Sequence, residues 1–491
     1  MKTKSLRELT DLLGKDGVLY QPEDLLLYEY DGSVERARPD CVVFPRSTDD
    51  VVRIVRLAKQ DRVALVGRGA GTGLSGGALA REGGIVVSFA RMNRILEIDV
   101  ENQRARVEPG VVNADLSLSV ADSGLHFAPD PSSQKACTIG GNVAENSGGP
   151  HTLAYGVTTN HVLGLQVVLP SSEILQLGSA PVDPPGLDLT GVFVGSEGTF
   201  GLVTEITLRL TPLPEAVSTL LAVYDSVDDA TETVAEITSC GITPAACEMM
   251  DGWTLRAVED YVHAGFPVDA AAVLLIDVDG LREVVEEEAQ AVADLCAAHQ
   301  ARSVRLARDA SERDLLWKGR KNAFGAAGRV SPSYYTQDGV IPRTKLPATL
   351  RRIEEIGRKY KLAIGNVFHA GDGNLHPIIL FDQRDNQQFR DAVRAADEII
   401  EFCIAAGGSI TGEHGVGMEK DRLMPLLFSE ADLDLMKRVR GVFNPDNLLN
   451  PGKIFPTSKG CGEIYVRAQP ILARPSGGSW PPLPFLKAWV R

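Results

Sequence analysis

Glycine-rich loops set against apolar strand segments constrain the fold of this chain most. Glycine supplies 48 of the 491 residues without a collagen-like period, so it must gather in particular loops. The first loop, 67–77, reads GRGAGTGLSGG and follows the apolar segment VALVG at 63–67. Consecutive glycines let backbone N–H groups converge on an anion such as a pyrophosphate. The plainer alternative is a flexible surface turn.

The spacing of these glycines does not predict a Rossmann fold. Gly71, Gly73 and Gly76 formally match the dinucleotide fingerprint. That fingerprint also needs a helix that opens at the third glycine and an acidic residue about 20 positions further on. Here a strand segment, 83–89, follows after a few residues. The context favours a phosphate loop joined to strands in another fold.

Charge and cysteine usage exclude several classes of protein. The net charge of −15 disfavours a nucleic-acid partner. No apolar run approaches the roughly 20 residues that span a bilayer, and the start lacks the apolar core of a secretory signal. The seven cysteines contain no C-x-x-C pair, so common iron–sulfur and zinc-ribbon spacings are absent. We expect a cytoplasmic protein without a membrane-spanning segment.

Changes in composition and in hydrophobic periodicity along the chain predict the domain organisation. Within the first part we expect a capped helix after Ser47, a hairpin over 95–112 and a loop-rich stretch over 127–150. After Pro214, strand and amphipathic-helix patterns alternate. The predicted parts are an N-terminal helical segment (1–36), a first domain (37–215), a second, α+β domain (216–420), a segment returning to the first domain (421–457) and a tail (458–491).

Several motifs occur in one order: PRSTDDVV at 45–52, the loop 67–77, PDPSS at 129–133, TIGGNVAENSGG at 138–149 and GSEGTFGLVTE at 195–205. In this order they resemble the FAD-binding domain of the vanillyl-alcohol-oxidase-type flavoproteins. The resemblance implies an α+β fold with a two-part FAD-binding domain and an α+β cap domain. It also implies that 67–77 binds the pyrophosphate, while 129–149 and 195–203 line the adenosine and the flavin. His126 lies outside the usual attachment motif, so we expect non-covalent FAD.

The resemblance carries over to individual FAD-contacting residues. They are Arg68, Gly69, Ala70, Gly71, Thr72, Gly73, Leu74, Gly76, Pro129, Asp130, Pro131, Ser132, Thr138, Gly140, Gly141, Asn142, Ala144, Asn146, Gly148, Gly149, Glu197, Gly198, Gly201 and Val203.

A second constellation indicates a metal site. Asp372-Gly373 is a hairpin-turn signal between two apolar runs. With these two residues as the turn, His369 faces His376, and two imidazoles on one face can bind one ion. Glu413, in the glycine-flanked sequence TGEHGVG, offers a third ligand and completes an open three-ligand set. The alternative is two polar strand histidines and a capping glutamate.

His414 follows this glutamate directly, and a neutral imidazole is the usual general base at neutral pH. The alternative for His414 is a structural hydrogen bond. Imidazole and carboxylate suit both zinc and manganese, of which we favour zinc.

The motifs VFHAGDGNLHP, GEHGVG and FNPDNLLNPGKIF (443–455) resemble the FAD-linked D-2-hydroxyacid dehydrogenases. This group includes D-lactate dehydrogenase, D-2-hydroxyglutarate dehydrogenase and the FAD subunit of bacterial glycolate oxidase, and the last is the most similar overall. The resemblance implies His369, His376 and Glu413 as metal ligands and His414 as the base. It also implies Arg320 at the substrate carboxylate, Asn374 near the substrate and Asn450 near the flavin.

The resemblance implies oxidation of a small D-2-hydroxy acid to the 2-oxo acid, with hydride transfer to flavin N5. The dicarboxylate enzymes carry a lysine about where this chain has Thr336, so we favour glycolate, which would give glyoxylate, or D-lactate. A D-lactate dehydrogenase that passes electrons to quinone or cytochrome is one alternative. Two others, from different classes, are a non-catalytic flavin-binding subunit and a metal-dependent hydrolase.

Electrons must leave through a separate acceptor. The resemblance implies iron–sulfur and second flavin-type subunits of a glycolate oxidase complex, and a quinone or cytochrome is the other route. Attachment at the periphery of the inner membrane would then occur through these partners.

Overall fold

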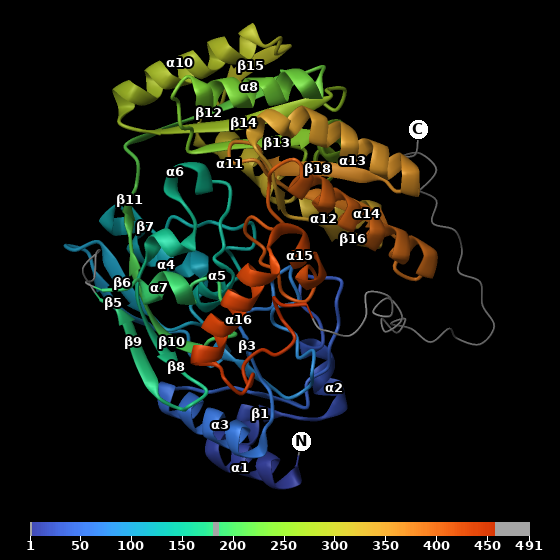
Figure 1. The fold of residues 1–491 in the computed structure, drawn as a ribbon. Helices are drawn as coiled ribbons and strands as arrows, with labels where there is room; N and C mark the ends of the chain where they lie inside the picture. The colour runs from blue at the N-terminus through green and yellow to red at the C-terminus, as the bar shows by residue number, and fades with distance from the viewer. Residues whose placement is uncertain (1, 180–185, 457–491) are drawn as a thin grey trace. The chain divides into compact units, whose positions relative to one another are not determined.

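The computed structural model describes residues 2–179 and 186–456, and its ribbon is drawn in Figure 1. The chain divides into two compact units. The first joins the described residues up to Leu213 to those from Glu413 onward, and the second holds Pro214–Gly412. The sequence predicts the two divisions after 215 and 420. The predicted tail, 458–491, lies outside the described residues.

The first unit contains a four-stranded sheet in the order β1-β2-β4-β3. Its strands are β1 (Val18–Leu19), β2 (Cys41–Val43), β3 (Leu65–Arg68) and β4 (Ile85–Ser88). β4 pairs parallel with β2 and β3, while β1 pairs antiparallel with β2. The segment 1–36 is therefore not wholly helical as predicted, because a two-residue strand is too short to show a period-2 pattern.

A second, five-stranded sheet of this unit is antiparallel in the order β5-β6-β10-β8-β9. Its strands are β5 (Ile95–Asp99), β6 (Arg104–Val107), β8 (Val162–Val168), β9 (Ile174–Gly178) and β10 (Leu202–Arg209). β5 and β6 confirm the hairpin predicted over 95–112. A separate two-stranded pair joins β7 (Leu125–His126) to β11 (Thr211–Pro212).

Two helices of the first unit that frame its glycine segments begin at capping side chains. α3 (Thr48–Asp61) begins after Ser47, whose side chain accepts a hydrogen bond from the Asp50 N–H, as predicted. The prediction of a loop-rich 127–150 is wrong in part, since α5 (Ile139–Glu145) lies within it. Thr138 caps α5, and Ile139 and Val143 are buried, which outweighs the poor helix propensity of two glycines. The other helices are α1 (Thr3–Leu13), α2 (Pro22–Leu25), α4 (Asn113–Val120), α6 (Thr152–Tyr155), α7 (Leu189–Phe193), α15 (Met424–Leu427) and α16 (Glu430–Phe443).

The C-terminal segment of the first unit lies beside β3. The Leu65 N–H donates to Leu448 O at 2.9 Å, and the Asn450 N–H donates to Leu65 O at 2.7 Å. Leu448 and Leu449 pack into the same core as α1, α3 and the four-stranded sheet. Residues far apart in sequence are therefore joined next to the first glycine loop.

The second unit is built on an antiparallel sheet in the order β15-β12-β14-β13-β18-β19-β17, with β20 pairing both β16 and β18. Its strands are β12 (Ala216–Tyr224), β13 (Ala246–Asp251), β14 (Ala272–Gly280), β15 (Ser303–Leu306), β16 (Ser333–Thr336), β17 (Gly339–Val340), β18 (Ile364–His369), β19 (Asn374–Leu375) and β20 (Pro377–Phe381).

Amphipathic helices pack on this sheet. Side chains of α9, α11 and α12 share a core with strands β12, β13, β14, β18 and β20. The helices of the unit are α8 (Val227–Ser239), α9 (Gly252–Val262), α10 (Arg282–Ala298), α11 (Ala310–Lys321), α12 (Ala323–Val330), α13 (Leu346–Tyr360) and α14 (Asn386–Ala405). Within the described ranges of the chain, no helix has both the length and the apolar character needed to cross a bilayer.

Candidate functional site

The glycine loop of the first unit turns directly after β3. Arg68, the last residue of β3, is buried, and its Nη2 donates to Tyr30 O at 2.9 Å. A Cβ at Gly71, where φ is +72°, would collide with the Arg68 guanidinium, and a Cβ at Gly69 would collide with Thr138 Oγ1. The loop can therefore approach the start of α5 only because these positions carry no side chain.

Asn450 ties two predicted segments together. Its Nδ2 donates to Gly77 O at 2.9 Å and to Glu197 O at 2.7 Å. Glu197 and Gly198 both have positive φ, 52° and 67°, so the backbone turns sharply there. Three segments separated by more than 100 residues each, around 77, 197 and 450, thus meet in one unit, as a common ligand would require.

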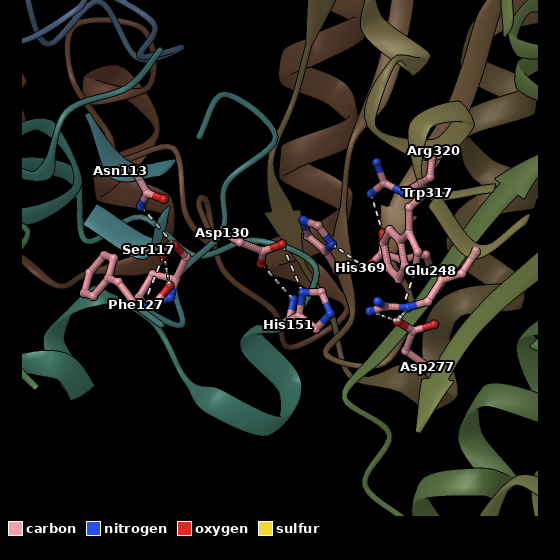
Figure 2. A network of polar contacts seen from close by, with 12 residues as sticks. Asn113, Ser117, Phe127, Asp130, His151, Glu248, Asp277, Trp317, Arg320 and His369 are labelled. Carbon is pink, nitrogen blue, oxygen red and sulfur yellow. Dashed lines mark hydrogen bonds and ion pairs between the residues drawn. The ribbon is translucent and has the colours of Figure 1, made fainter. Parts of the chain in front are cut away.

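The other predicted FAD-contacting residues fall on these segments or next to them. Pro129 O accepts from Asn113 Nδ2 at 2.9 Å, and an Asp130 carboxylate oxygen lies 3.0 Å from His151 Nδ1 (Figure 2). Asn146 ends α5 in the left-handed conformation. The loop after β3 holds Ala70, Thr72, Gly73, Leu74 and Gly76. Pro131 and Ser132 precede α5, which holds Gly140, Gly141, Asn142 and Ala144, and Gly148 and Gly149 follow it. Gly201 directly precedes β10, and Val203 lies near the start of that strand.

Two buried donors show how FAD would fit. Within the part of the chain that the structure describes, Arg68 Nη1 and Asn142 Nδ2 are buried without a hydrogen-bond partner. Leaving such a donor unpaired costs about 1–3 kcal/mol, so an acceptor is expected to meet it. A dinucleotide carries phosphate and heterocycle acceptors. The residues of this loop cluster therefore fit FAD.

The sequence reasoning missed two charged residues in the same cluster. Glu145 ends α5, with Ser75 Oγ 3.4 Å from its carboxyl. Partial burial, followed by the negative charge of Glu197, raises the pKa of Glu145 well above its ordinary value. Lys453 is fully buried, and its Nζ donates to Leu79 O at 2.6 Å, while burial lowers its pKa to about 8. Both residues lie within glycine-containing motifs of the sequence, and this position could have identified them as site residues.

In the second unit the histidine hairpin has a different register from the predicted one. His369 pairs with Asn374, and Asn366 pairs with Pro377, so the prediction that His369 directly faces His376 is wrong. The turn centres one residue earlier, because the Gly371 N–H bonds to Cys247 O of β13 and the Gly373 N–H bonds to His369 O.

The two histidines nevertheless come together. A shift of two residues keeps the side chain on the same face of a sheet, whereas a shift of one would reverse it. His376 is therefore a diagonal neighbour of His369. The ring centroids lie 5.0 Å apart with the planes at 89°.

Each histidine bonds through Nδ1. His369 Nδ1 lies 2.7 Å from Glu248 Oε1, and His376 Nδ1 lies 3.3 Å from Gln337 O. Since a carboxylate and a carbonyl only accept, each Nδ1 carries the proton, and Nε2 is the nitrogen that each ring would present to an ion. Metal-ligating histidines in proteins are held in this way. The pair therefore fits a divalent metal.

Arg320 lies in the last turn of α11 and is only 1% exposed. Its guanidinium forms an ion pair with Glu248 (Figure 2). Arg320 Nη2 is the atom of this ion pair, whereas Nε is buried without a hydrogen bond to any residue that the structure describes. A buried guanidinium with an open donor position suits a carboxylate.

Asp338 organises the neighbourhood of Asn374 and was also missed by the sequence reasoning. Asn374 Nδ2 donates to Asp338 Oδ1 at 2.7 Å, and Thr411 Oγ1 and the Gly412 N–H donate to Asp338 Oδ2 at 2.5 and 3.0 Å. Asp338 therefore fixes the last two residues before Glu413.

Glu413 and His414 open the returning segment of the first unit. Both side chains are mostly buried. Glu413 lies against Gly148, where a Cβ would stand 2.9 Å from Glu413 Oε2. The N–H groups of Val416 and Gly417 each donate to the Glu197 carboxylate at 2.7 Å. The turn that carries Glu413 and His414 is thus anchored on a residue of the predicted flavin site.

Comparison with known proteins identifies the family of this chain. Residues 39–178 match the model of an FAD binding domain, and residues 213–454 match that of the C-terminal domain of FAD linked oxidases. The glycolate oxidase subunit GlcD of Escherichia coli K12 is 48% identical over 91% of this chain and 90% of its own length. The chain belongs to the FAD-linked oxidase family.

Two further relatives have lower sequence identity. GlcD of Bacillus subtilis 168 is 42% identical over 93% of this chain and 97% of its own length. The mitochondrial D-lactate dehydrogenase [cytochrome] of Arabidopsis thaliana is 31% identical over 85% and 74%.

Solved structures confirm the fold. p-Cresol methylhydroxylase superposes with a TM-score of 0.80 at 17% identity, covering 92% of this chain and 96% of that one. 4-Ethylphenol oxidase of Gulosibacter chungangensis superposes with a TM-score of 0.76 at 19% identity, covering 92% and 97%. The fold is the predicted α+β architecture of vanillyl-alcohol-oxidase type, and the chain is an FAD-dependent oxidoreductase.

Proposed function

We propose that this oxidoreductase converts glycolate to glyoxylate as the flavin subunit of a glycolate oxidase. Relatives named as glycolate oxidase subunits at 48% and 42% identity support this substrate. The observation that carries the proposal is Arg320, a buried guanidinium whose Nε has no hydrogen-bond partner among the described residues, on the unit that holds the histidine pair. A small carboxylate with a neighbouring hydroxyl matches such a set.

We assign roles to the residues of both units as part of the proposal. Arg320 binds the substrate carboxylate, and Asn374 lies beside the substrate. His369, His376 and Glu413 bind one divalent ion, with zinc favoured over manganese. His414 takes the hydroxyl proton. The residues of the glycine segments and Asn450 bind FAD without a covalent bond.

The bound groups would supply what side chains lack. FAD supplies a two-electron acceptor, and the ion supplies a Lewis acid that lowers the pKa of a hydroxyl. The chain's own residues orient the acid and remove the proton. Glu248 and Gln337 hold the histidine rings in one tautomer, and Glu197 holds the backbone after His414.

The partners and the location are finer parts of the proposal. The word subunit in the names of both GlcD relatives supports assembly into a complex. We propose that iron–sulfur and second flavin-type subunits take the electrons, with a quinone or cytochrome as the other acceptor. The protein would then act in the cytoplasm, at the inner membrane when bound to these partners.

A panel of hydroxy acids tests the substrate. The FAD-containing protein is mixed anaerobically with glycolate, D-lactate, L-lactate or D-2-hydroxyglutarate, and the flavin absorbance near 450 nm is followed. Glycolate should bleach the flavin fastest, D-lactate more slowly and L-lactate least. Faster bleaching by D-lactate would favour the dehydrogenase alternative, which the 31% identical relative supports less strongly. Bleaching by L-lactate alone would contradict the assignment.

A further inference from the structure

Glu248 stands in an unusual place for a charged residue. It lies on β13, between β14 and β18, and is 1% exposed. Its neighbours along the strand, Cys247 and Met249, are buried as well. An unpaired carboxylate in such a strand would be strongly destabilising, so its partners must account for it.

Those partners are the two residues with proposed roles at the substrate and the ion. Across the sheet Glu248 pairs with His369, whose Nδ1 lies 2.7 Å from Oε1. The other oxygen, Oε2, forms the ion pair with Arg320. One carboxylate therefore touches both the proposed metal ligand and the proposed carboxylate binder (Figure 2).

Both oxygens of the Glu248 carboxylate are engaged, Oε1 with His369 Nδ1 and Oε2 with Arg320 Nη2. A carboxylate oxygen accepts the hydrogen bond from the His369 ring, so this contact fixes the ring proton on Nδ1. The ion pair with Arg320 holds the guanidinium on the other side of the same carboxylate.

Asp277 offers a comparison within the same unit. It is fully buried on β14 and binds Thr219 Oγ1 at 2.6 Å, Arg313 Nη2 at 3.0 Å and Trp317 Nε1 at 3.0 Å. None of these partners has a proposed role in binding or catalysis. Asp277 thus shows what a buried carboxylate does when it serves the fold alone.

We infer that Glu248 is a positioning residue that couples ion binding at His369 to carboxylate binding at Arg320. It orients His369 so that Nε2 faces the ion, and it holds the guanidinium in place for the substrate. The inference rests on the proposed function and deepens it. Its consequence is that one substitution weakens two binding events while the chemical step survives at saturation.

The test compares Glu248→Gln with the control Asp277→Asn, both as FAD-loaded full-length protein. Zinc affinity is measured by competition with a chromogenic chelator, and KM and kcat with glycolate are measured at saturating zinc. Glu248→Gln should weaken zinc binding about ten- to hundredfold, as loss of such supporting carboxylates does. It should also raise KM for glycolate more than it lowers kcat. Asp277→Asn should lower Tm without changing either affinity.

Glu248→Asp covers the case in which Glu248→Gln does not fold. It keeps the charge but withdraws the carboxylate, so zinc affinity should fall and KM should rise here too. Wild-type zinc affinity and KM in a folded Glu248 variant, with only Tm lowered, would overturn the inference. Wild-type protein that binds no divalent ion would instead refute the proposed function, which separates the two failures.

Discussion

The two units differ in how polar side chains at their candidate sites are held. In the first unit, Asn450 bonds to Gly77 O and Glu197 O, Lys453 to Leu79 O and His161 to Tyr155 O, all of them backbone acceptors. In the second unit, two clusters join side chain to side chain, Glu248–Arg320–His369 and Asp338–Asn374–Thr411, although His376 bonds to Gln337 O.

This difference follows from what each unit is proposed to hold. A large dinucleotide contacts the backbone along its length, and glycine lets the backbone approach it closely. Glycine motifs in the sequence therefore mark such a site. A small acid and an ion need few groups with fixed charge and direction, and those groups are held by other side chains. Substitutions in the two units should therefore impair different properties of the protein.

The largest effect is expected at His414, where chemistry depends on a side chain while the surrounding backbone belongs to the flavin-binding unit. His414→Ala should lower kcat about 10²–10⁴-fold, the usual contribution of a general base. FAD content should stay at the wild-type level, because the Val416 and Gly417 N–H groups still bind Glu197. Stopped-flow bleaching and absorbance per protein measure both, with His299→Ala as control. Equal bleaching rates in the two variants would remove His414 from the role of base.

A smaller effect is expected from the acid titration of His161, a buried residue bonded to backbone. Its Nε2 donates to Tyr155 O at 2.9 Å, and burial lowers its pKa from 6.5 to about 4. Between pH 6.5 and 4, His161 is protonated in the unfolded chain but neutral in the folded chain. The free energy of unfolding therefore falls as the pH falls. The loss is at most about 3 kcal/mol at 1.36 kcal/mol per pKa unit.

The variant His161→Gln should keep a donor for Tyr155 O and flatten this pH dependence. Denaturant unfolding at pH 7, 5.5 and 4.5 measures it in both proteins. Parallel curves for variant and wild type would show that another group is responsible.

The smallest effect is expected in the glycine loop. Gly71→Ala forces a side chain into φ +72° and against Arg68, and such strain costs roughly 1–2 kcal/mol. FAD affinity should fall about tenfold, with the stability of the second unit unchanged. Gly124→Ala is the matched control, since Gly124 has φ +71° with nothing within 4 Å of an added Cβ. Flavin titration of the apoproteins compares them, and equal affinities would contradict a backbone-built flavin site.

The sequence alone displays more of the first unit's candidate site than of the second's. Glycine motifs are local, so 67–77, 138–149 and 195–201 can be located without knowledge of the fold. Glu248 and Asp338 could not be located in this way, because nothing in the local sequence around either acid indicates a partner more than 70 residues away. The histidine hairpin lies between these cases. The predicted turn was one residue too late, because Cys247 O of another strand accepts a hydrogen bond from the Gly371 N–H. Side chains two residues apart on a strand share a face, so His369 and His376 still lie on the same face of the sheet.

Removal of the metal tests most directly the central claim that the flavin and the reactive ion are bound by different means. The FAD-loaded protein is treated with a chelator, its absorbance near 450 nm is recorded, and bleaching by glycolate is followed before and after zinc is restored. FAD should remain bound throughout, while bleaching should disappear with the metal and return with zinc. Unchanged bleaching in protein shown to be metal-free, or loss of FAD together with the metal, would contradict the account.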